Sequence, residues 1–457
     1  MKRAGVLLIL TALVAVCAAA LGIRGMTAQR RLTPAGAIAP SPERDFITFS
    51  GSYDTGTRTL RGTQTMTLTN RTGSALEDIV LRLGMNGDDP GAVAVSGAAV
   101  DGRGVSARQD ADDPTILRIG CGWQPGQTIG LTFTLMIRCA KTDGAVLINL
   151  PSLAVWEDGA WRTDAWDALA APGMAQAFDY AIALDVQRGT QVVFGGDLTA
   201  LSDAGDTIRY AAQMQGARDV TFALLEDGSV RQGETQGVLV TAMGQSGSDA
   251  ARLLARTREA LDSLEKIGLR CPFASLTVVQ AQTARADGVA YSGLLALDAQ
   301  GDGETLLRRL TRLAARESFG VQVGVDAFRA PWLSETLASV SELLAYRARK
   351  GAAAYETRFF EEIEPATRLT RPHGVCVGAG VDRFGGDAEM TQVLRDQGAA
   401  MLLGIGMAAG EDALAGALSR YAQENAGQLA SRTALERALE EATGSAWDGY
   451  LADGLGD

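Results

Sequence analysis

Histidine is nearly missing from this sequence, because His373 is the only one among 457 residues. A metal site that takes two imidazole ligands from one chain therefore cannot form. A Ser-His-Asp triad would have to use His373, and no G-x-S-x-G nucleophile elbow accompanies it. The scarcity of histidine thus excludes every two-histidine metal centre and gives serine hydrolase chemistry no support.

Cysteine is also scarce. Four of the five cysteines lie beyond the N-terminal segment, at wide and unpatterned spacing: Cys121, Cys139, Cys271 and Cys376. This spacing argues against a disulfide scaffold or a zinc ribbon, so we expect these residues to be buried as small apolar side chains. His373 and Cys376, with Glu361 or Glu362, would be a weak metal site, since zinc needs three or four ligands at recognisable spacing.

The chain has no block rich in lysine and arginine, and 42 basic residues stand against 54 acidic ones, which gives a net charge of -12. Nucleic acid is therefore not an expected partner. The hydrophobic content of 46% is enough for real cores, and the length allows two or three domains.

An uncharged, apolar stretch covers residues 4–23, between Arg3 and Arg24. Its length matches the roughly 20 residues that a membrane-spanning helix needs, and exceeds the apolar core of most signal peptides. We therefore predict that residues 1–27 form a single N-terminal membrane anchor or a signal segment, with the rest of the chain outside the cytoplasm at the cell membrane. A secreted protein with a cleaved signal peptide is the alternative.

Two patterns divide the rest of the chain. Residues 28–44 are rich in Pro, Ala, Gly and Arg and read as a linker. From residue 45 to 233, apolar residues alternate with polar ones, as Leu60, Met66 and Leu68 do among threonines, and turn signals separate short strands. This pattern predicts an antiparallel β-sandwich domain.

From residue 234 to 457 the apolar spacing becomes mainly helical. A helix capped by Ser248 opens this domain, a strand follows at "FASLTVVQ", and a capping box at Thr433 and Glu436 begins the last predicted helix. Further helices are predicted at about 303–318, 331–349, 388–409 and 411–425. The fold class is therefore α+β with several domains, a β-sandwich domain followed by a mainly helical one.

One helical stretch, "TRLAARESFG", carries Arg312 and Arg316 at the i, i+4 spacing that places two side chains on one face. Glu335, in "PWLSETLAS", follows Arg316 after 18 residues. An H-E-x-x-H zinc helix has two histidines at this spacing, with a glutamate after the first. This pair of segments resembles the gluzincin zinc peptidases of the aminopeptidase N type, in which 18 residues separate H-E-x-x-H from a zinc-binding glutamate.

The resemblance covers nearly the whole chain after residue 45. The stretch "ITFSGSYDTGTRTLRGTQTMTLTN" is similar to the opening strands of the family's saddle-shaped β domain. "DGVAYSGLLAL" is similar to its exopeptidase loop, and "VLRDQGAAMLLGI" to its helical part. The resemblance implies a thermolysin-like second domain.

The resemblance also implies that the catalytic groups are replaced. The two zinc histidines match Arg312 and Arg316, the water-activating glutamate matches Leu313, the amine-binding glutamate matches Ala290 and the oxyanion tyrosine matches Arg395. Only Glu335 is retained. A guanidinium offers no lone pair to a metal, so we expect no catalytic residue and no zinc.

We hypothesise that Arg316, or else Arg312, forms an ion pair with Glu335 in place of the metal, because an unpaired buried carboxylate is costly. The expected function is that of an inactive, membrane-tethered, aminopeptidase-like binding or scaffolding module with a peptide or membrane-protein partner. The alternative is an active zinc-dependent aminopeptidase with an unrecognised site. Trp156, Trp161 and Trp166 are interpreted as packing at a domain junction rather than as a ligand platform.

Overall fold

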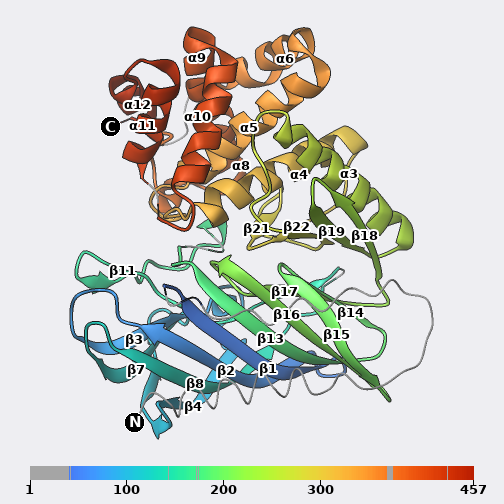
Figure 1. Cartoon of the computed structure of the whole chain (residues 1–457), viewed down its shortest axis with the longest axis vertical. Helices are drawn as coiled ribbons and strands as arrows, with labels where there is room; N and C mark the ends of the chain where they lie inside the picture. The colour runs from blue at the N-terminus through green and yellow to red at the C-terminus, as the bar shows by residue number, and fades with distance from the viewer. Residues whose placement is uncertain are drawn as a thin grey trace.

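The computed structural model describes residues 41 and 43–456, except 143, 171, 173, 368–373 and 430. Strands make up one half of the molecule and helices most of the other half, as Figure 1 shows. The predicted order, a mostly β domain followed by a mainly helical one, is confirmed.

An eight-stranded sheet forms the larger layer of the first domain, in the order β15-β16-β13-β1-β2-β8-β4-β5. Its pairs are antiparallel except for β1 and β13, which run parallel. The strands are β1 (Asp45–Asp54), β2 (Thr59–Thr69), β4 (Val93–Val100), β5 (Arg103–Gly104), β8 (Thr128–Arg138), β13 (Phe178–Gln187), β15 (Asp197–Ala204) and β16 (Thr207–Ala217). Leu60, Met66 and Leu68 of β2 are fully buried, as their alternation predicts.

Three smaller sheets complete the first domain. The four-stranded sheet contains β3 (Leu76–Arg82), β6 (Ala107–Gln109), β7 (Ile116–Trp123) and β10 (Ser152–Leu153), and shares a core with the large sheet. The three-stranded sheet contains β9 (Val146–Asn149), β14 (Thr190–Phe194) and β17 (Thr221–Glu226). A two-stranded ribbon pairs β11 (Trp156–Glu157) with β12 (Ala160–Trp161), so that the two tryptophan rings meet edge to face.

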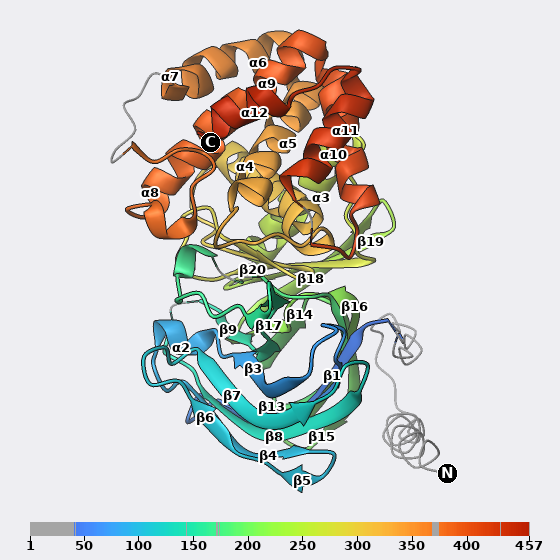
Figure 2. The same cartoon turned by 90° about the vertical axis from the view of Figure 1, so that its left-hand side faces the viewer.

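A five-stranded sheet lies where the second domain faces the first, below the helices in Figures 1 and 2. Its strands are β18 (Ser229–Thr235), β19 (Val238–Gly244), β20 (Ser275–Gln280), β21 (Val289–Tyr291) and β22 (Leu294–Leu297). Apolar residues of this sheet and of the three-stranded sheet form one shared core between the domains. Because β18 pairs with β19, the boundary predicted between residues 233 and 234 falls inside β18.

The helices of the second domain pack above this sheet around the largest core. They are α3 (Gly247–Glu265), α4 (Gly303–Arg316), α5 (Trp332–Lys350), α6 (Ala352–Arg358), α7 (Glu364–Thr367), α8 (Asp387–Met390), α9 (Gly398–Ala409), α10 (Glu411–Glu424), α11 (Arg432–Thr443) and α12 (Asp448–Leu455). Three π-helical segments adjoin them: η2 (Glu317–Gln322) after α4, η3 (Phe359–Ile363) after α6, and η6 (Thr391–Gln397) between α8 and α9.

Two predicted helix caps are wrong. Helix α3 begins after Ser246, whose side chain accepts a hydrogen bond from the Asp249 amide, so the cap lies two residues before the predicted Ser248. Helix α11 begins after Ser431, which makes no side-chain capping bond, and Glu436 accepts from Arg432 instead of closing a capping box with Thr433. A neighbouring serine therefore caps α3, whereas no side chain caps α11.

The predicted membrane location is not supported. Among the described residues, none of the helices combines the length and the hydropathy needed to cross a bilayer. The two longest, α3 and α5, have 19 residues each and carry several charged side chains. The segment on which the prediction rested, 1–27, lies outside the described residues, as does most of the linker 28–44. The described residues therefore give the predicted N-terminal membrane anchor no support.

Arg218 joins the two domains. It follows β16 in the first domain, and its guanidinium donates hydrogen bonds to backbone carbonyls at Val321 (2.6 Å) and Gln428 (2.9 Å) in the second domain, and at Ala175 (2.6 Å) in the first. Burial lowers the pKa of Arg218 to about 10. A Cβ at Gly324 would overlap this guanidinium, so the Arg218 side chain fits only because residue 324 is a glycine.

We therefore expect Gly324→Ala to lower the free energy of unfolding by about 1–3 kcal/mol, the usual range for an overpacked site. The matched control is Gly416→Ala in α10, where an added Cβ meets nothing within 4 Å. There the better helix propensity of alanine stabilises by up to about 1 kcal/mol. Denaturant unfolding of both variants tests this, and equal stability of the two would show that Arg218 is not confined by Gly324.

Candidate functional site

Helices α4 and α5 bring complementary charges face to face. Asp302 caps α4 through a 2.7 Å hydrogen bond from the Thr305 amide, and leucines of α4 enter the domain core. Arg309, Arg312 and Arg316 recur at the spacing of one helix face. Glu335 in the first turn of α5 and Glu342 two turns later form the facing acidic pair. The position of Glu335 at a helix N-terminus favours its negative charge.

Glu335 is held by arginines from three different segments. Its Oε1 accepts a hydrogen bond from Arg285 Nη1 at 2.5 Å, and its Oε2 accepts one from Arg316 Nη2. Arg395 Nε lies 3.7 Å from the same Oε2. The exposed fraction of these four side chains is only 4–8%. The carboxylate is therefore buried, and it is balanced by more than one positive charge.

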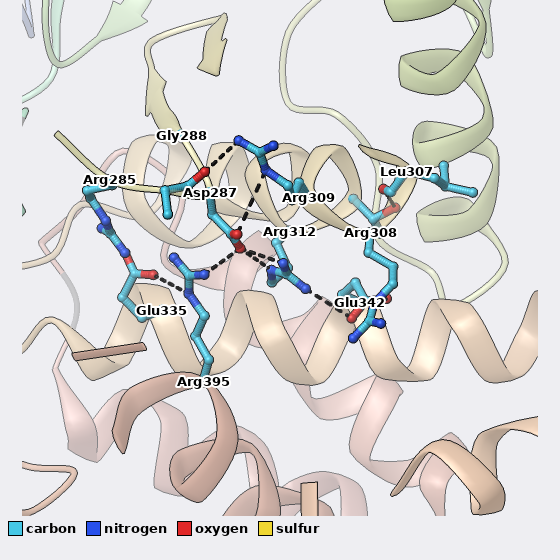
Figure 3. Close-up of polar contacts among 12 residues, drawn as sticks. Arg285, Asp287, Gly288, Leu307, Arg308, Arg309, Arg312, Glu335, Glu342 and Arg395 are labelled. Carbon is cyan, nitrogen blue, oxygen red and sulfur yellow. Dashed lines mark hydrogen bonds and ion pairs between the residues drawn. The ribbon is translucent and has the colours of Figure 1, made fainter. Parts of the chain in front are cut away.

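Asp287 forms the second centre of the cluster, as Figure 3 shows. Arg312 donates to its Oδ2 from Nε at 2.8 Å and from Nη2 at 2.5 Å, and Arg395 Nη1 contacts the same oxygen. Burial alone would raise the pKa of Asp287, but Arg312 and Arg395 outweigh it and hold that pKa well below its usual range. Asp287 is therefore ionised at any physiological pH.

Glu342, two turns after Glu335 in α5, forms a third centre. Arg358 binds both of its oxygens, at 2.8 and 2.6 Å, in the two-pronged arrangement that guanidinium and carboxylate groups favour. Arg312 Nη1 reaches the same carboxylate at 3.4 Å. Arg312 thus links Asp287 with Glu342, and the three centres form one network.

The arginines of this network are crowded and desolvated. Burial lowers the pKa of Arg285 and of Arg395 to about 10 in each case, although neighbouring carboxylates oppose the shift. The pKa of Arg316 is lowered well below its usual value, first by burial and then by the charges of Arg285 and Arg395. The like charges therefore repel one another at close range, and the interleaved carboxylates hold them together.

The structure places the residues singled out in the sequence as follows. Arg316 lies against Glu335, whereas Arg312 binds Asp287 and Glu342 instead. Leu313 is fully buried in the domain core, and Ala290 is buried in β21. Arg395 enters the network from η6.

Four members of the network around these three centres were not singled out in the sequence: Arg285, Asp287, Glu342 and Arg358. A signal existed for two of them. Glu342 lies seven residues after Glu335, which places both on one helix face, and Asp287 directly precedes the exopeptidase-like "GVAYSG". No sequence pattern indicated Arg285 or Arg358, because these residues approach the carboxylates only in the folded chain.

The residues at this site do not fit a zinc ion. A zinc site needs three or four N, S or O donors around one point, and the described residues contain no group of three His, Cys, Asp or Glu so arranged. Both nearby carboxylates, Glu335 and Asp287, already accept from arginines. His373 lies outside the described residues, and Glu362 from the weak candidate site binds Arg308 and Arg358.

The other cysteine and tryptophan predictions have mixed outcomes. The four cysteines among the described residues are free, but only Cys139 is buried and the other three are half-buried.

The tryptophans singled out in the sequence lie in or beside the first domain. Trp161 donates a hydrogen bond to Asp78 at 3.1 Å in the first domain. Trp166 lines a cavity of about 80 Å³ between the domains, together with Arg82, Asp326 and Phe328.

Comparison with known proteins supports the fold. No protein-family model matches the sequence, and no curated protein matches it either. Among solved structures, the chain is similar to an M1 zinc metallopeptidase of Deinococcus radiodurans in a glutamate-to-alanine mutant form, with 18% identity, a TM-score of 0.62, and coverage of 90% of this chain and 93% of that one.

A second solved structure agrees with the first. It is a two-domain M1 zinc metallopeptidase, again a glutamate-to-alanine mutant and bound to L-arginine, with 17% identity, a TM-score of 0.64 and the same coverage of both chains. At these identities the likeness establishes the two-domain M1 metallopeptidase fold. The predicted fold class is confirmed.

We expect Glu335→Gln to lower the free energy of unfolding by about 3–5 kcal/mol, because it leaves Arg285 and Arg316 as buried charges without their carboxylate. The matched control is Glu441→Gln, which breaks an exposed ion pair with Arg420 and changes stability by less than about 1 kcal/mol. Denaturant unfolding at neutral pH measures both. Equal losses in the two variants would contradict the dependence on Glu335.

Glu317, next to Arg316, gives a pH-dependent prediction. Its side chain is fully buried; Oε2 accepts a hydrogen bond from the Gly293 amide at 3.1 Å, and Oε1 has no hydrogen-bond partner among the described residues. Burial raises the pKa of Glu317 well above its usual value, and nearby Asp219 adds to the shift. The folded state therefore holds a proton that the unfolded chain releases as pH rises above about 4.5, so stability falls with rising pH.

We expect Glu317→Gln to raise the free energy of unfolding at pH 7.5 by about 1–2 kcal/mol, because a neutral amide avoids the cost of keeping or losing that proton. The gain should shrink toward pH 4. Glu424→Gln, at an exposed position of α10, serves as the control and should show no such trend. A gain that is equal at both pH values would rule out the protonation argument.

Proposed function

We propose that this protein is a catalytically inactive chain with the fold of a zinc aminopeptidase, and that it binds a peptide or protein partner instead of hydrolysing one. The observation that carries the proposal is the double hold on Glu335 by Arg285 and Arg316. Glu335 matches the glutamate that binds zinc in the peptidases, and here its two oxygens are engaged by guanidinium groups.

Charge balance supports the proposal. A zinc ion brings two positive charges to its ligands, and two arginines bring the same charge to a buried carboxylate. The arginines also supply directed hydrogen bonds, which a buried carboxylate needs. The scaffold can therefore keep its retained glutamate without a metal.

The missing chemistry supports it as well. A zinc peptidase uses the metal to lower the pKa of a water molecule and a glutamate to take its proton. At the matching positions this chain has Arg312, Leu313 and Arg316, and none of these side chains can bind zinc or accept a proton at neutral pH. Arg395 occupies the position matched to the oxyanion tyrosine and is engaged with Asp287.

A binding role has a place in the fold. The cavity between the domains is lined by residues of both, among them Trp166 and Arg82 from the first and Asp326 and Phe328 from the second. Arg162 bridges the domains at its edge, with Asp164 at 2.7 Å and Asp326 at 2.8 Å. At about 80 Å³ the cavity is much smaller than a pocket for a whole ligand, roughly 300–1,000 Å³, so it offers a partner room for one small group beside Trp166 and Phe328.

We expect the purified chain, prepared in zinc-containing medium, to carry substoichiometric zinc by elemental analysis and to show no hydrolysis of aminoacyl-fluorophore substrates. An active aminopeptidase of the same fold, treated in parallel with and without chelator, serves as the control. One zinc ion per chain together with chelator-sensitive turnover would overturn the proposal and favour the alternative, an active zinc-dependent aminopeptidase.

A further inference from the structure

The arginine network has more positive than negative charge. Ion pairs within 4.0 Å connect seven arginines with five carboxylates, which leaves two positive charges without a partner of their own. The arginines are Arg285, Arg308, Arg309, Arg312, Arg316, Arg358 and Arg395, and the carboxylates are Asp287, Glu335, Glu342, Glu362 and Asp387. Such an excess is costly in a region where water is largely excluded.

One further acid lies nearby. Asp396 is adjacent to Arg395 in η6, and burial raises its pKa to about 6 although Arg312 and Arg395 lower it. When ionised it offsets one of the two surplus charges. The network thus remains positive in either protonation state of Asp396.

Besides Arg285 Nε and Arg309 Nε, which lie 3.6 and 3.8 Å from a carboxylate oxygen, three buried guanidinium nitrogens of the network have no hydrogen-bond acceptor among the described residues: Arg285 Nη2, Arg316 Nε and Arg395 Nη2. All three belong to side chains that are more than nine-tenths buried and that converge on Glu335. A buried donor without a partner costs about 1–3 kcal/mol, so three at one place call for an acceptor. Figure 3 shows Arg285 and Arg395 directed toward Glu335 and Asp287.

Two ion pairs in the network are too long to be hydrogen bonds, so the Nε–H groups of Arg285 and Arg395 are not satisfied by these carboxylates. Arg285 Nε lies 3.6 Å from Asp387 Oδ1, and Arg395 Nε lies 3.7 Å from Glu335 Oε2, whereas N–H···O bonds are about 2.7–3.2 Å. The side of the cluster formed by Asp287, Arg312 and Asp387 is 16–18% exposed, which gives solvent a route to the arginines.

We propose that Arg285, Arg316 and Arg395 bind a small oxyanion with two negative charges, of the phosphate or sulfate class. Such an ion brings negative charge to a network that stays positive in either protonation state of Asp396, and it offers several acceptor oxygens to the planar forks of the three guanidinium groups. This inference rests on the proposed function, because a zinc ion at Glu335 would need the carboxylate that the arginines hold.

The test uses the full chain in a buffer free of phosphate, with phosphate, sulfate, acetate or chloride added at equal ionic strength. We expect millimolar phosphate and sulfate to raise the Tm by about 2–4 °C more than chloride does, because a ligand that binds only the folded state stabilises it. Isothermal titration then gives the affinity, and inorganic phosphate against a phosphorylated peptide separates a free ion from a phosphoryl group on a partner.

Variants locate the site. Arg395→Gln should weaken phosphate binding by about tenfold or more, the effect of losing one charge-assisted contact. Arg395→Lys keeps the charge but loses the fork, and should lie between Arg395→Gln and the unchanged chain. Arg420→Gln removes an exposed arginine that pairs with Glu441, and should bind like the unchanged chain.

Each outcome decides the proposal. Equal stabilisation by all four anions would overturn it, and so would binding that is unchanged in Arg395→Gln. Stabilisation by acetate as strong as that by phosphate would overturn the dianionic class. Failure here with a zinc-free, inactive chain would leave the proposed function standing, whereas stoichiometric zinc with turnover would remove the proposed function itself.

Discussion

The burial of the Glu335 carboxylate is the constraint on which the centre of the second domain depends. Its side chain is 5% exposed, so its charge cannot be solvated by bulk water and must be met by the protein. Arg285 comes from the loop before β21, Arg316 from the end of α4 and Arg395 from η6. One carboxylate thus fixes the relative position of three segments that are distant in sequence.

A metal ion would bind its ligands at one point, whereas the arginines spread the same role over a larger volume. Asp287 and Glu342 separate the guanidinium groups, and Arg312 joins these two acids. The result is an extended network of ion pairs inside the helical half of the molecule. Its cohesion depends on every member, since removal of one acid exposes the remaining arginines to one another.

Much of the architecture could be predicted from the sequence, and the reasons are local. Alternation along β2 and the helical spacing of α4 and α5 are properties of neighbouring residues, so the two-domain order followed from them. The resemblance of "PWLSETLAS" to a peptidase segment pointed to Glu335, and the i, i+4 spacing of Arg312 and Arg316 pointed to one helix face.

What could not be predicted depends on tertiary contacts. The sequence suggested a pair between Arg316 and Glu335, but the antiparallel course of α4 and α5, which brings Arg312, one turn earlier, to Glu342, is a tertiary property. Arg285 and Arg358 join through loops and helix ends whose course no local pattern defines. The predicted start of the second domain falls inside β18. The sequence of this strand is mostly polar, so it resembles a linker between domains.

The three π-helical segments all adjoin the network: η2 follows Arg316, η3 contains Glu362, and η6 contains Arg395. Each wide turn accommodates one residue more than an α-helical turn does, and this changes the angular phase of everything after it. Since successive α-helical residues are about 100° apart, excising one residue from η6 would swing the preceding side chains away from their present direction relative to α9. The direction of the Arg395 side chain therefore depends on the extra residue in η6. If that residue were deleted, a different side chain would point toward Asp287 and Glu335.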